Sequence, residues 1–589
     1  MSEGTPSADY VSREWRFKDQ DATSEELVRI TGLSPVTVAL CLRRNLKTAE
    51  EIAEYLSPRL DRLTSPWLLK DMRRAVDRVA TARESGEEVW IFGDYDVDGT
   101  TGAALLGLFF RELKIPVQLR QPDRFKDGYG LNVGAVEEAS SAGVRLMITV
   151  DCGITSFAAA RRAAELGLDL IVLDHHQLDQ EQGLPQALAV INPQRTDCES
   201  GLKQICGCAV AFYFAMALRS HGREKNWWAS GAEPNLKQHL DLVVMATAAD
   251  IVPLIGDNHI LVRHGMEVLR NSRKAGVRAL LAAAGVADRE LSPGHLGFVL
   301  GPRINASGRM GSASTALDLL TSDDSQRAME LAQQLEHINA ERAELQNQIW
   351  DEVRQVVEAG LAEGKFQHGI AVADPGWHEG VVGIVASRVV ETYRRPAVVM
   401  SVREKDVKGS ARTFAGKDVL KALRACSEWL IGFGGHTHAA GLTLDSRHFE
   451  RFQQAFDDAV KFLPEDSEQK PLHLDGQLRF EDMDLKTLQE IERLGPFGPG
   501  NPEPIFAIEA VLARKSVLKG RHLKMTLSSS TPSVKRGGSI EAIWFHAAEH
   551  LPWIEKAGQL MWAGVPELNR FRGKITPTFR IRDVRRLTT

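Results

Sequence analysis

Short apolar runs alternate with amphipathic segments over much of the chain. Between residues 88 and 193 the runs are EVWIFGD, VRLMITVDCG, LDLIVLDHH and ALAVINP, separated by helix-like stretches such as TTGAALLGLFFREL. Short apolar runs that alternate with helical patterns predict buried strands of a parallel sheet. The same pattern resumes further on with GIAVADP, GVVGIVASRVVETY and PAVVMS. The chain is therefore predicted to contain two α/β lobes.

A long polar segment, from about residue 316 to 364, separates the two α/β patterns. Apolar side chains recur in it at steps of three or four from Ala328 to Val356, with Arg342 as the exception. No Gly or Pro occurs between Thr321 and Ala359. This pattern predicts one long helix, which either packs on a surface or connects the lobes. Because the α/β pattern resumes after it, a connector is favoured.

The two ends of the chain differ from its middle. Amphipathic stretches such as TAEEIAEYL predict helices near the N-terminus. Beyond the polar stretch FLPEDSEQKPLH, strand-like runs such as SIEAIWF and ITPTFRIRDVRRL predict a small β-barrel. The predicted domains are a helical segment over 1–70, α/β lobes over 71–315 and 365–460, a connector helix over 316–364 and a barrel over 461–589.

The composition is that of an ordinary globular protein, with 43% hydrophobic and 25% charged residues. No apolar run reaches the roughly 18 residues that cross a bilayer, and the N-terminus lacks the pattern of a secretory signal. Six cysteines are too few for a disulfide framework, and the spacing of Cys206 and Cys208 does not fit a common zinc site. These features predict a cytoplasmic protein without a membrane role.

Charge is distributed unevenly around the net value of −6. Residues 505–589 contain 15 Lys and Arg against 6 Asp and Glu, a net charge of +9, which leaves −15 for the rest. Basic and aromatic residues alternate there, as at Arg570, Phe571, Arg572, Phe579 and Arg580. Charge for phosphates and rings for bases suit a single-stranded nucleic acid. The alternative is a solvated sheet face.

Three aspartates stand at alternate positions in GDYDVDGTT, namely Asp94, Asp96 and Asp98. Carboxylates this close repel one another unless a cation neutralises them. The spacing matches the first half of an EF-hand calcium loop, but Leu105 stands where that loop needs a bidentate glutamate. The preceding run also has the pattern of a strand rather than a helix. A calcium loop is therefore a poor explanation.

Side chains that commonly bind metals also follow other predicted strands. Asp151 follows LMITV, Asp174, His175 and His176 follow LIVL, and Asp250 ends an apolar helix. Because parallel strands end at one edge of a sheet, these side chains should meet the three aspartates there. Oxygen donors with one or two imidazoles suit Mn²⁺ or Mg²⁺ better than zinc. The number of carboxylates leaves room for two ions, an arrangement that hydrolyses phosphoesters.

The motifs DYDVDGTT, VDCGITS and DHH resemble the first three motifs of the DHH phosphoesterase family. CGCAVAF, DLVVMATAADIVPLIGDNHILVRHG and GPRINASGRMG resemble the RecJ branch of that family, and WHEGVVGIVASRV, GSART and GFGGHTHAAGL resemble its second, DHHA1-type lobe. LGPFGPGNPEPIF then leads into a segment that is an OB-fold in that branch. The resemblance implies an α/β protein with two parallel-sheet lobes, a long joining helix and a C-terminal OB-fold β-barrel.

The resemblance also implies roles for the residues at the predicted sheet edge. Two ions of Mn²⁺ or Mg²⁺ would be held by Asp94, Asp96, Asp98, Asp151, His175 and Asp250. His176 and Asp98 would be catalytic, with His176 as an acid or a charge stabiliser beside the scissile phosphate. Without the resemblance, the two histidines are equally well explained as a capping pair. Neighbouring side chains diverge at a strand end, so one can bind a metal while the other faces substrate.

Candidate substrate-binding residues lie mostly in segments that contain glycine. Arginine can donate two parallel hydrogen bonds to a phosphate, and glycine lets the backbone approach an anion closely. A turn with solvated arginines, or a structural histidine in a glycine loop, is the alternative. The resemblance implies that GSART helps to grip a terminal 5′ phosphate and that the loop GFGGHTHAAG contacts a nucleotide. The predicted set is Arg124, Arg303, Asn305, Arg309, Ser410, Arg412, Gly434, Gly435 and His436.

The predicted function is a two-metal exonuclease of DNA repair and recombination that degrades single-stranded DNA in the 5′→3′ direction to 5′-mononucleotides. A DHH phosphoesterase for short oligonucleotides, cyclic dinucleotides or pyrophosphate would lack the basic C-terminal module. A scaffold that only binds single strands would have lost metal carboxylates, which this sequence retains. Single-stranded DNA is the expected partner. By resemblance alone, a single-strand-binding protein and a helicase are further partners, and the protein is expected to be a monomer.

Overall fold

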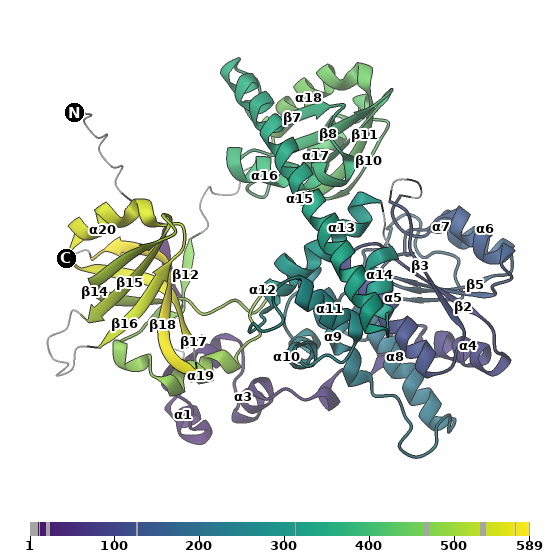
Figure 1. Ribbon diagram of the computed structural model, residues 1–589, viewed down its shortest axis with the longest axis horizontal. Helices are drawn as coiled ribbons and strands as arrows, with labels where there is room; N and C mark the ends of the chain where they lie inside the picture. The colour runs from purple at the N-terminus through teal and green to yellow at the C-terminus, as the bar shows by residue number, and fades with distance from the viewer. Residues whose placement is uncertain are drawn as a thin grey trace. The chain divides into compact units, whose positions relative to one another are not determined.

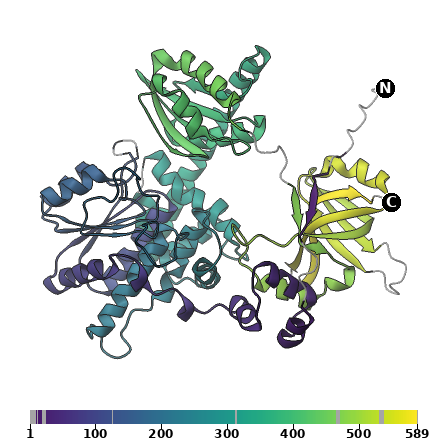
Figure 2. The same ribbon diagram turned by 180° about the vertical axis from the view of Figure 1, so that it is seen from behind.

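The computed structural model describes residue 10 and residues 12–18, 24–124, 126, 128–311, 314–464, 471–529, 538–571 and 573–587. The chain divides into two units (Figures 1 and 2). Unit 1 consists of Met1–Thr64, Ile251–His264 and Gln469–Thr589, and unit 2 of Ser65–Asp250 and Gly265–Glu468. Among the described residues, no helix combines the length and apolar character needed to cross a membrane.

The first lobe of unit 2 is built on a five-stranded sheet with the order β3-β2-β4-β5-β6. The strands are β2 (Val89–Gly93), β3 (Val117–Arg120), β4 (Leu146–Val150), β5 (Asp169–Leu173) and β6 (Ala189–Ile191), and every pair is parallel. All residues of β2 and β4 are buried, as expected for the centre of a sheet covered on both faces. The predicted parallel sheet is confirmed for this lobe.

These strands alternate with the helices α4 (Met72–Ser85), α5 (Val97–Glu112), α6 (Val133–Ser141) and α7 (Phe157–Glu165), and the last strand is followed by α8 (Gly207–Glu224) and α9 (Leu240–Ala249). After α10 (Asp257–Arg270) come α11 (Ala275–Ala283), α12 (Pro293–His295), a π-helical turn (Leu296–Leu300), α13 (Gly301–Met310) and α14 (Ser314–Thr321). The segment GPRINASGRMG is therefore a helix, and the alternative that it forms a turn is wrong.

The long connector is helix α15 (Ser325–Ala362). The predicted single helix over 316–364 is wrong at its beginning, because residues 316–321 belong to α14 and a break separates the two helices. The side chain of Asp324 accepts a hydrogen bond from the N–H of Arg327 and starts the new helix there. Helix α15 packs against α11 and α13 of the first lobe and against α16 (Glu379–Tyr393) of the second, as a connector should.

The second lobe has a mixed sheet with the order β10-β11-β9-β8-β7. Only β7 (Ile370–Asp374) and β8 (Ala397–Arg403) are parallel, whereas β9 (Asp406–Arg412), β10 (Gly432–His436) and β11 (Ala439–Asp445) pair antiparallel. The predicted parallel sheet is therefore wrong for this lobe. Two-residue connections join β8 to β9 and β10 to β11, and such short turns join only antiparallel strands. Helices α17 (Val419–Ala425) and α18 (Phe449–Lys461) complete the lobe.

The C-terminal part of unit 1 is a closed barrel, as predicted. Its strands are β14 (Phe506–Leu518), β15 (His522–Ser529), β16 (Ser539–Trp544), β17 (Leu560–Phe571) and β18 (Lys574–Arg586). β14 pairs with both β15 and β17, which closes the sheet on itself. The short strands β12 (Leu472–Leu474) and β13 (Gly476–Gln477) and the helices α19 (Leu485–Arg493) and α20 (Leu551–Ala557) lie with it.

The N-terminal segment folds with this barrel, which the sequence did not indicate. Helices α1 (Glu25–Thr31), α2 (Pro35–Arg43) and α3 (Ala49–Leu56) form as predicted, but β1 (Trp15–Phe17) is a strand and pairs with β12. Leu40 and Ile52 share one hydrophobic core with Trp562 and Phe579 of the barrel. Figures 1 and 2 show these helices beside the barrel from both sides.

Because this core is shared, Ile52→Ala should destabilise unit 1. The side chain is 1% exposed, and its loss should lower the free energy of unfolding by roughly 2–5 kcal/mol. Calorimetry should show a lower unfolding temperature for unit 1. Ile30→Ala is the control, since Ile30 is 57% exposed and its loss should cost less than about 0.5 kcal/mol. Equal effects of the two substitutions would contradict the shared core.

Candidate metal centre and anion pocket

Acidic and imidazole side chains gather at the carboxyl edge of the first sheet. Asp94 follows β2, Asp151 follows β4, and His175 and His176 follow β5. These three strands are neighbours in the sheet, so their ends meet at one edge, as the sequence predicted. Asp250 follows the last residue of α9 and lies with them, 3.8 Å from His175 between Oδ2 and Nε2.

The six predicted metal ligands form two compact groups. Asp94, Asp96 and Asp151 are one group, and Asp98, His175 and Asp250 are the other, with candidate ligand atoms within 4.8 Å of one another in each. Nε2 of His175 lies 3.1 Å from Oδ1 of Asp151, which joins the groups. The structure thus brings all six side chains together in two groups, each of which could hold one ion. Their role as ligands stays a prediction.

The local fold explains how these carboxylates are positioned. Asp96 caps α5 by accepting a hydrogen bond from the N–H of Gly99. Both oxygens of Asp98 accept hydrogen bonds from the first turn of α8, at 2.6 Å from the N–H of Gly207 and 2.7 Å from that of Cys208. Position 207 requires glycine, because a Cβ there would lie 2.7 Å from the Cβ of Asp151.

Asp151 adopts a backbone conformation that is rare for residues other than glycine, with φ of 61°. Such strain persists only where the surrounding structure enforces it, and it is concentrated at functional sites. Here the N–H of Asp151 donates to the carbonyl oxygen of Leu173 at the end of the neighbouring strand. The strained residue is thus the one whose carboxylate lies between the two groups.

Burial and mutual repulsion raise the pKa values of these carboxyl groups. For Asp94, burial and then the charge of Asp96 raise the pKa well above its usual range. Burial and then the charge of Asp98 have the same effect on the pKa of Asp151, and they raise the pKa of Asp250 to about 8. A cation among them would remove the cause of these shifts, because it favours the charged forms.

The donors fit a hard divalent cation. Both carboxylate oxygens of Asp94 are buried, and among the described residues neither accepts a hydrogen bond of normal geometry. An ionised carboxylate left without partners in this way is costly unless an ion binds it. Five carboxylates with one imidazole are donors of the kind that Mn²⁺ and Mg²⁺ accept.

His176 is oriented by a buried carboxylate. Its Nδ1 donates to Oδ1 of Asp174 at 2.8 Å, which leaves Nε2 directed 3.3 Å from the hydroxyl of Tyr129. Burial lowers the pKa of His176, but the hydrogen bond and charge of Asp174 outweigh it and bring the pKa to about 9. His176 also forms a candidate metal group with Asp151 and His175. Its side chain is 36% exposed against 13% for His175, so His176 is the more accessible of the two.

Four arginines gather where the two lobes meet inside unit 2. Arg309 donates to the carbonyl oxygen of Gly380, and its pKa is lowered to about 10 by burial and then by the charge of Arg124, with further contributions from Arg342 and Arg412. Among the described residues, none of the four forms an ion pair with a carboxylate. Partly buried cations that repel one another in this way favour the binding of an anion, which stays a prediction for this site.

Arg342 and Tyr129 are candidates that the sequence reasoning missed. Arg342 was the single exception to the apolar stripe of the connector helix, and a cation in such a stripe was the available signal. Its Nε is buried and without a partner among the described residues. Tyr129 lies in the same segment as Arg124 and contacts His176, so it stands between the anion site and the metal centre.

Other predicted substrate residues lie elsewhere or have other partners. Arg303 donates two hydrogen bonds to the carboxylate of Glu336 in α15, from Nε at 2.6 Å and from Nη2 at 3.1 Å. In this conformation the guanidinium is not available to bind a phosphate. Asn305 leaves Oδ1 buried without a partner among the described residues. Gly434, Gly435 and His436 belong to strand β10, so the predicted glycine loop is wrong and the segment is a hairpin with β11.

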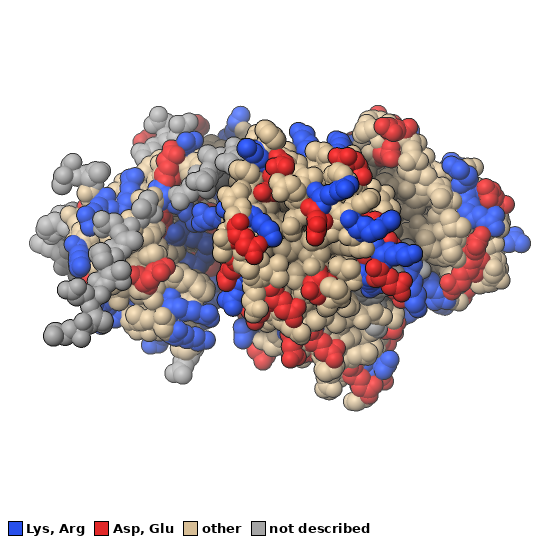
Figure 3. Space-filling model, turned by 90° about the horizontal axis from the view of Figure 1, so that it is seen from above, with Lys and Arg blue, Asp and Glu red and all other residues tan. Residues whose placement is uncertain are grey.

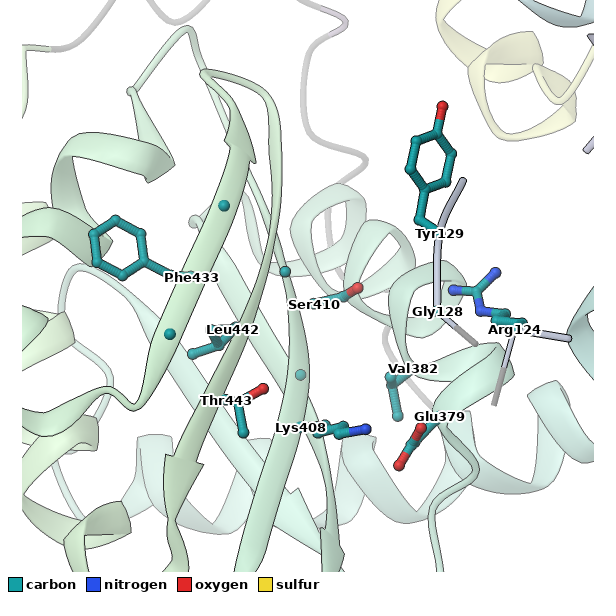
Figure 4. Close-up of a pocket in the computed structure, with 14 residues that line it drawn as sticks. Arg124, Gly128, Tyr129, Glu379, Val382, Lys408, Ser410, Phe433, Leu442 and Thr443 are labelled. Atoms are coloured by element: carbon teal, nitrogen blue, oxygen red, sulfur yellow. The ribbon is translucent and has the colours of Figure 1, made fainter. Parts of the chain in front are cut away.

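A pocket of about 530 Å³ adjoins the arginine group (Figure 4). Arg124, Gly128 and Tyr129 of the first lobe lie on one side, and the exposed face of β9 to β11 lies on the other. Ser410 lines the pocket. The absence of a side chain at Gly383 of α16 leaves space for Ser410, because a Cβ at position 383 would lie 3.0 Å from the Oγ of Ser410 and 2.9 Å from the guanidinium of Arg412. Ser410 and Arg412 thus lie close together beside Gly383, and their role in binding an anion stays a prediction.

Family models match three parts of the chain. The DHH family N-terminal domain matches residues 88–247, the DHHA1 domain residues 366–461 and the RecJ OB domain residues 474–583. Fold, donor cluster and matches define the class as a DHH–DHHA1 protein with a C-terminal OB domain.

Relatives that match most of the chain identify the family within this class. The single-stranded-DNA-specific exonuclease RecJ of Salmonella typhimurium is 35% identical over 525 residues, which are 87% of this chain and 89% of that protein. The chain belongs to the RecJ family. A crystal structure of Thermus thermophilus RecJ with Mn²⁺ matches at a TM-score of 0.80 and 28% identity, covering 98% of this chain and 80% of that one. A structure of RecJ from that organism with Mg²⁺ matches at 0.73 and 26%, covering 98% and 79%.

The carboxylate cluster predicts how stability depends on pH without metal. Asp250 has a folded pKa of about 8, above its unfolded value of 3.8, so the folded state binds more protons between these values. The free energy of unfolding should therefore fall as pH rises from 5 to 8 in EDTA. His176, whose pKa is raised to about 9, also makes the free energy of unfolding fall as pH rises. Mn²⁺ should raise the unfolding temperature most at pH 8.

The measurement is thermal unfolding of the whole chain at several pH values, with EDTA or with Mn²⁺. Asp250→Asn removes one repelling charge and should raise the unfolding temperature in EDTA at pH 8. Asp288→Asn, at an exposed position, is the control and should leave it unchanged. A rise in stability from pH 5 to pH 8 in EDTA would contradict the repulsion.

Proposed function

We propose that this chain hydrolyses single-stranded DNA from its 5′ end, one nucleotide at a time, to 5′-mononucleotides. As a member of the RecJ family it is a single-stranded-DNA-specific exonuclease that uses Mn²⁺ or Mg²⁺. The observation that carries the direction of attack is the pairing of two sites in unit 2. A donor cluster that could hold two ions lies on one side of Tyr129, and on the other lie arginines that form no ion pair with a carboxylate among the described residues.

Each of the two groups of side chains at the metal centre would bind one ion. Asp94, Asp96 and Asp151 would hold one ion, and Asp98, His175 and Asp250 the other. When bound, the ions supply a hydroxide at neutral pH and stabilise the charge of the phosphoryl transition state. The protein fixes this arrangement through the α8 hydrogen bonds to Asp98 and the strained backbone of Asp151.

His176 is placed to act on the scissile phosphate. Asp174 holds its Nδ1–H and directs Nε2 towards the space beside Tyr129. With its pKa raised to about 9, the imidazole is protonated at neutral pH and can donate a hydrogen bond or a proton at Nε2. We assign it to the non-bridging or leaving oxygen of the phosphodiester. Asp98, hydrogen-bonded through both oxygens, acts by holding the second ion.

The arginine site sets the polarity in this proposal. Arg124, Arg309 and Arg412, with the Ser410 hydroxyl, would hold the terminal 5′ phosphate. The first phosphodiester would then lie at the metal centre, and a strand without a free 5′ end would be excluded from the grip. The full carboxylate set argues against a scaffold without activity, and the barrel argues against a phosphoesterase for small nucleotides.

The barrel is proposed to hold the rest of the strand, with less free charge than the sequence indicated. Arg580 pairs with Glu503 and Glu567, and Arg570 with Glu492, so several basic residues are neutralised. Arg572 lies outside the described residues. Figure 3 shows both acidic and basic side chains on the face of the whole molecule that it draws. Phe545 is 50% exposed, so its ring could stack on a base.

Cellular context completes the proposal. All six cysteines are free and buried, which suits a reducing cytoplasm. A monomeric state and cooperation with a single-strand-binding protein and a helicase are proposed by family resemblance.

The two histidines should separate catalysis from metal binding. His176→Ala should lower turnover by roughly 10²–10⁴-fold with bound Mn²⁺ nearly unchanged, because one proton or hydrogen-bond donor is lost. His175→Ala should instead lower the bound Mn²⁺, measured by elemental analysis after gel filtration. His337→Ala, an exposed position on α15, is the control for both readouts. The reverse pattern would mean that the ligand and the catalyst are exchanged.

The 5′ grip should appear in the order of product release. With a strand labelled at either end, mononucleotides should come first from the 5′ end. Arg412→Gln should raise KM for a 5′-phosphorylated strand by roughly tenfold or more, because one charge-assisted hydrogen bond to the phosphate is lost. Arg424→Gln, exposed on α17, should not. Release first from the 3′ end would refute the polarity.

A further inference from the structure

The pocket extends along β9 past the position of a terminal monophosphate. Lys408 lines it two residues before Ser410, on the same face of the strand, and two residues of a strand span about 6.8 Å. In Figure 4, Tyr129 lies at one end of the pocket, and Lys408 lies with Glu379 at the other. The far end is thus separated from the metal centre by the Ser410 position.

Three glycines keep this part of the pocket open. Gly432, Gly434 and Gly441 line it, and a Cβ at any of them would meet nothing within 4 Å. None of the three has a positive φ, so neither packing nor backbone conformation requires glycine there. The effect of these glycines is to leave space over the sheet and to expose its backbone to a ligand.

The charges at this end favour an anion. Among the described residues, the ammonium group of Lys408 has no ion pair or hydrogen bond. Glu379 is the one acidic residue among those that line the pocket, and Arg403 neutralises it at 2.7 Å. A monophosphate at Ser410 and Arg412 leaves Lys408 without a partner.

We propose that the far end binds the outer phosphates of a 5′-di- or triphosphorylated strand, with Lys408 as their cation. This inference rests on the proposed grip of the first phosphate by Ser410 and Arg412. The spacing along β9 suits a chain of phosphates that begins at Ser410 and ends at Lys408. Water would then attack the phosphorus of the second nucleotide, and O3′ of the first would leave and take a proton. The first product would be a nucleoside di- or triphosphate.

Binding without metal tests the subsite apart from catalysis. Three eight-nucleotide strands, labelled with fluorescein at the 3′ end, carry a 5′ hydroxyl, monophosphate or triphosphate, and anisotropy is measured in EDTA. The triphosphate should bind roughly three- to tenfold tighter than the monophosphate, as expected for one added charge-assisted contact. Lys408→Gln should reduce triphosphate binding to the monophosphate level and leave the monophosphate within about twofold. Lys405→Gln, at the exposed turn before β9, should change neither.

The outcomes separate the two proposals. The subsite is refuted if the unaltered protein binds the triphosphate strand no more tightly than the monophosphate strand. It is also refuted if Lys408→Gln weakens the binding of the monophosphate and triphosphate strands by the same factor. If the monophosphate binds no tighter than the hydroxyl end, the 5′ grip fails instead. In that case a Lys408-dependent preference for the triphosphate would still support the subsite as an anion site.

Discussion

Repulsion among buried carboxylates at one edge of a parallel sheet is the constraint to which the first lobe is adapted. Asp94, Asp96 and Asp151 lie so close to one another and to Asp98 that burial and neighbouring charge raise their pKa values. The fold does not relieve this by spreading the groups apart. It fixes them with backbone donors, a glycine at position 207 and a strained backbone at Asp151, so that cations complete the site.

The opposite problem arises at the junction of the lobes. Arg124, Arg309 and Arg412 repel one another without carboxylate partners among the described residues, so this region has an excess of positive charge. In the proposed function, a strand with a 5′ phosphate would relieve both kinds of repulsion, because its phosphates would neutralise the arginines and would contact the ions held by the carboxylates. Tyr129 contacts His176 and lines the arginine pocket, so one residue links the two sites. Helix α15 joins the lobes and carries Arg342 into the same region.

Local patterns predicted the first lobe well and the second lobe less well. Apolar runs followed by Asp94, Asp151 and His175 mark strand ends, and strand ends of one parallel sheet converge whatever the helices between them do. In the second lobe, β9 and β10 are rich in glycine and polar residues, so they lack the apolar run that identifies a strand. The β10 segment was therefore predicted as a glycine loop, β9 was not predicted as a strand, and the sheet was wrongly expected to be parallel.

By itself, the sequence determined the alternation of strands and helices, the barrel and the donor residues at the sheet edge, because these follow from periodicity and from which residues end each strand. The tertiary structure alone decided which charges have partners. Arg303 is neutralised by Glu336, which lies on another helix, whereas Arg342 is left without a carboxylate among the described residues. It also decided that the N-terminal helices share a core with a barrel more than 400 residues away in the chain. Such pairings depend on which distant surfaces pack together, and no local pattern of residues encodes that choice.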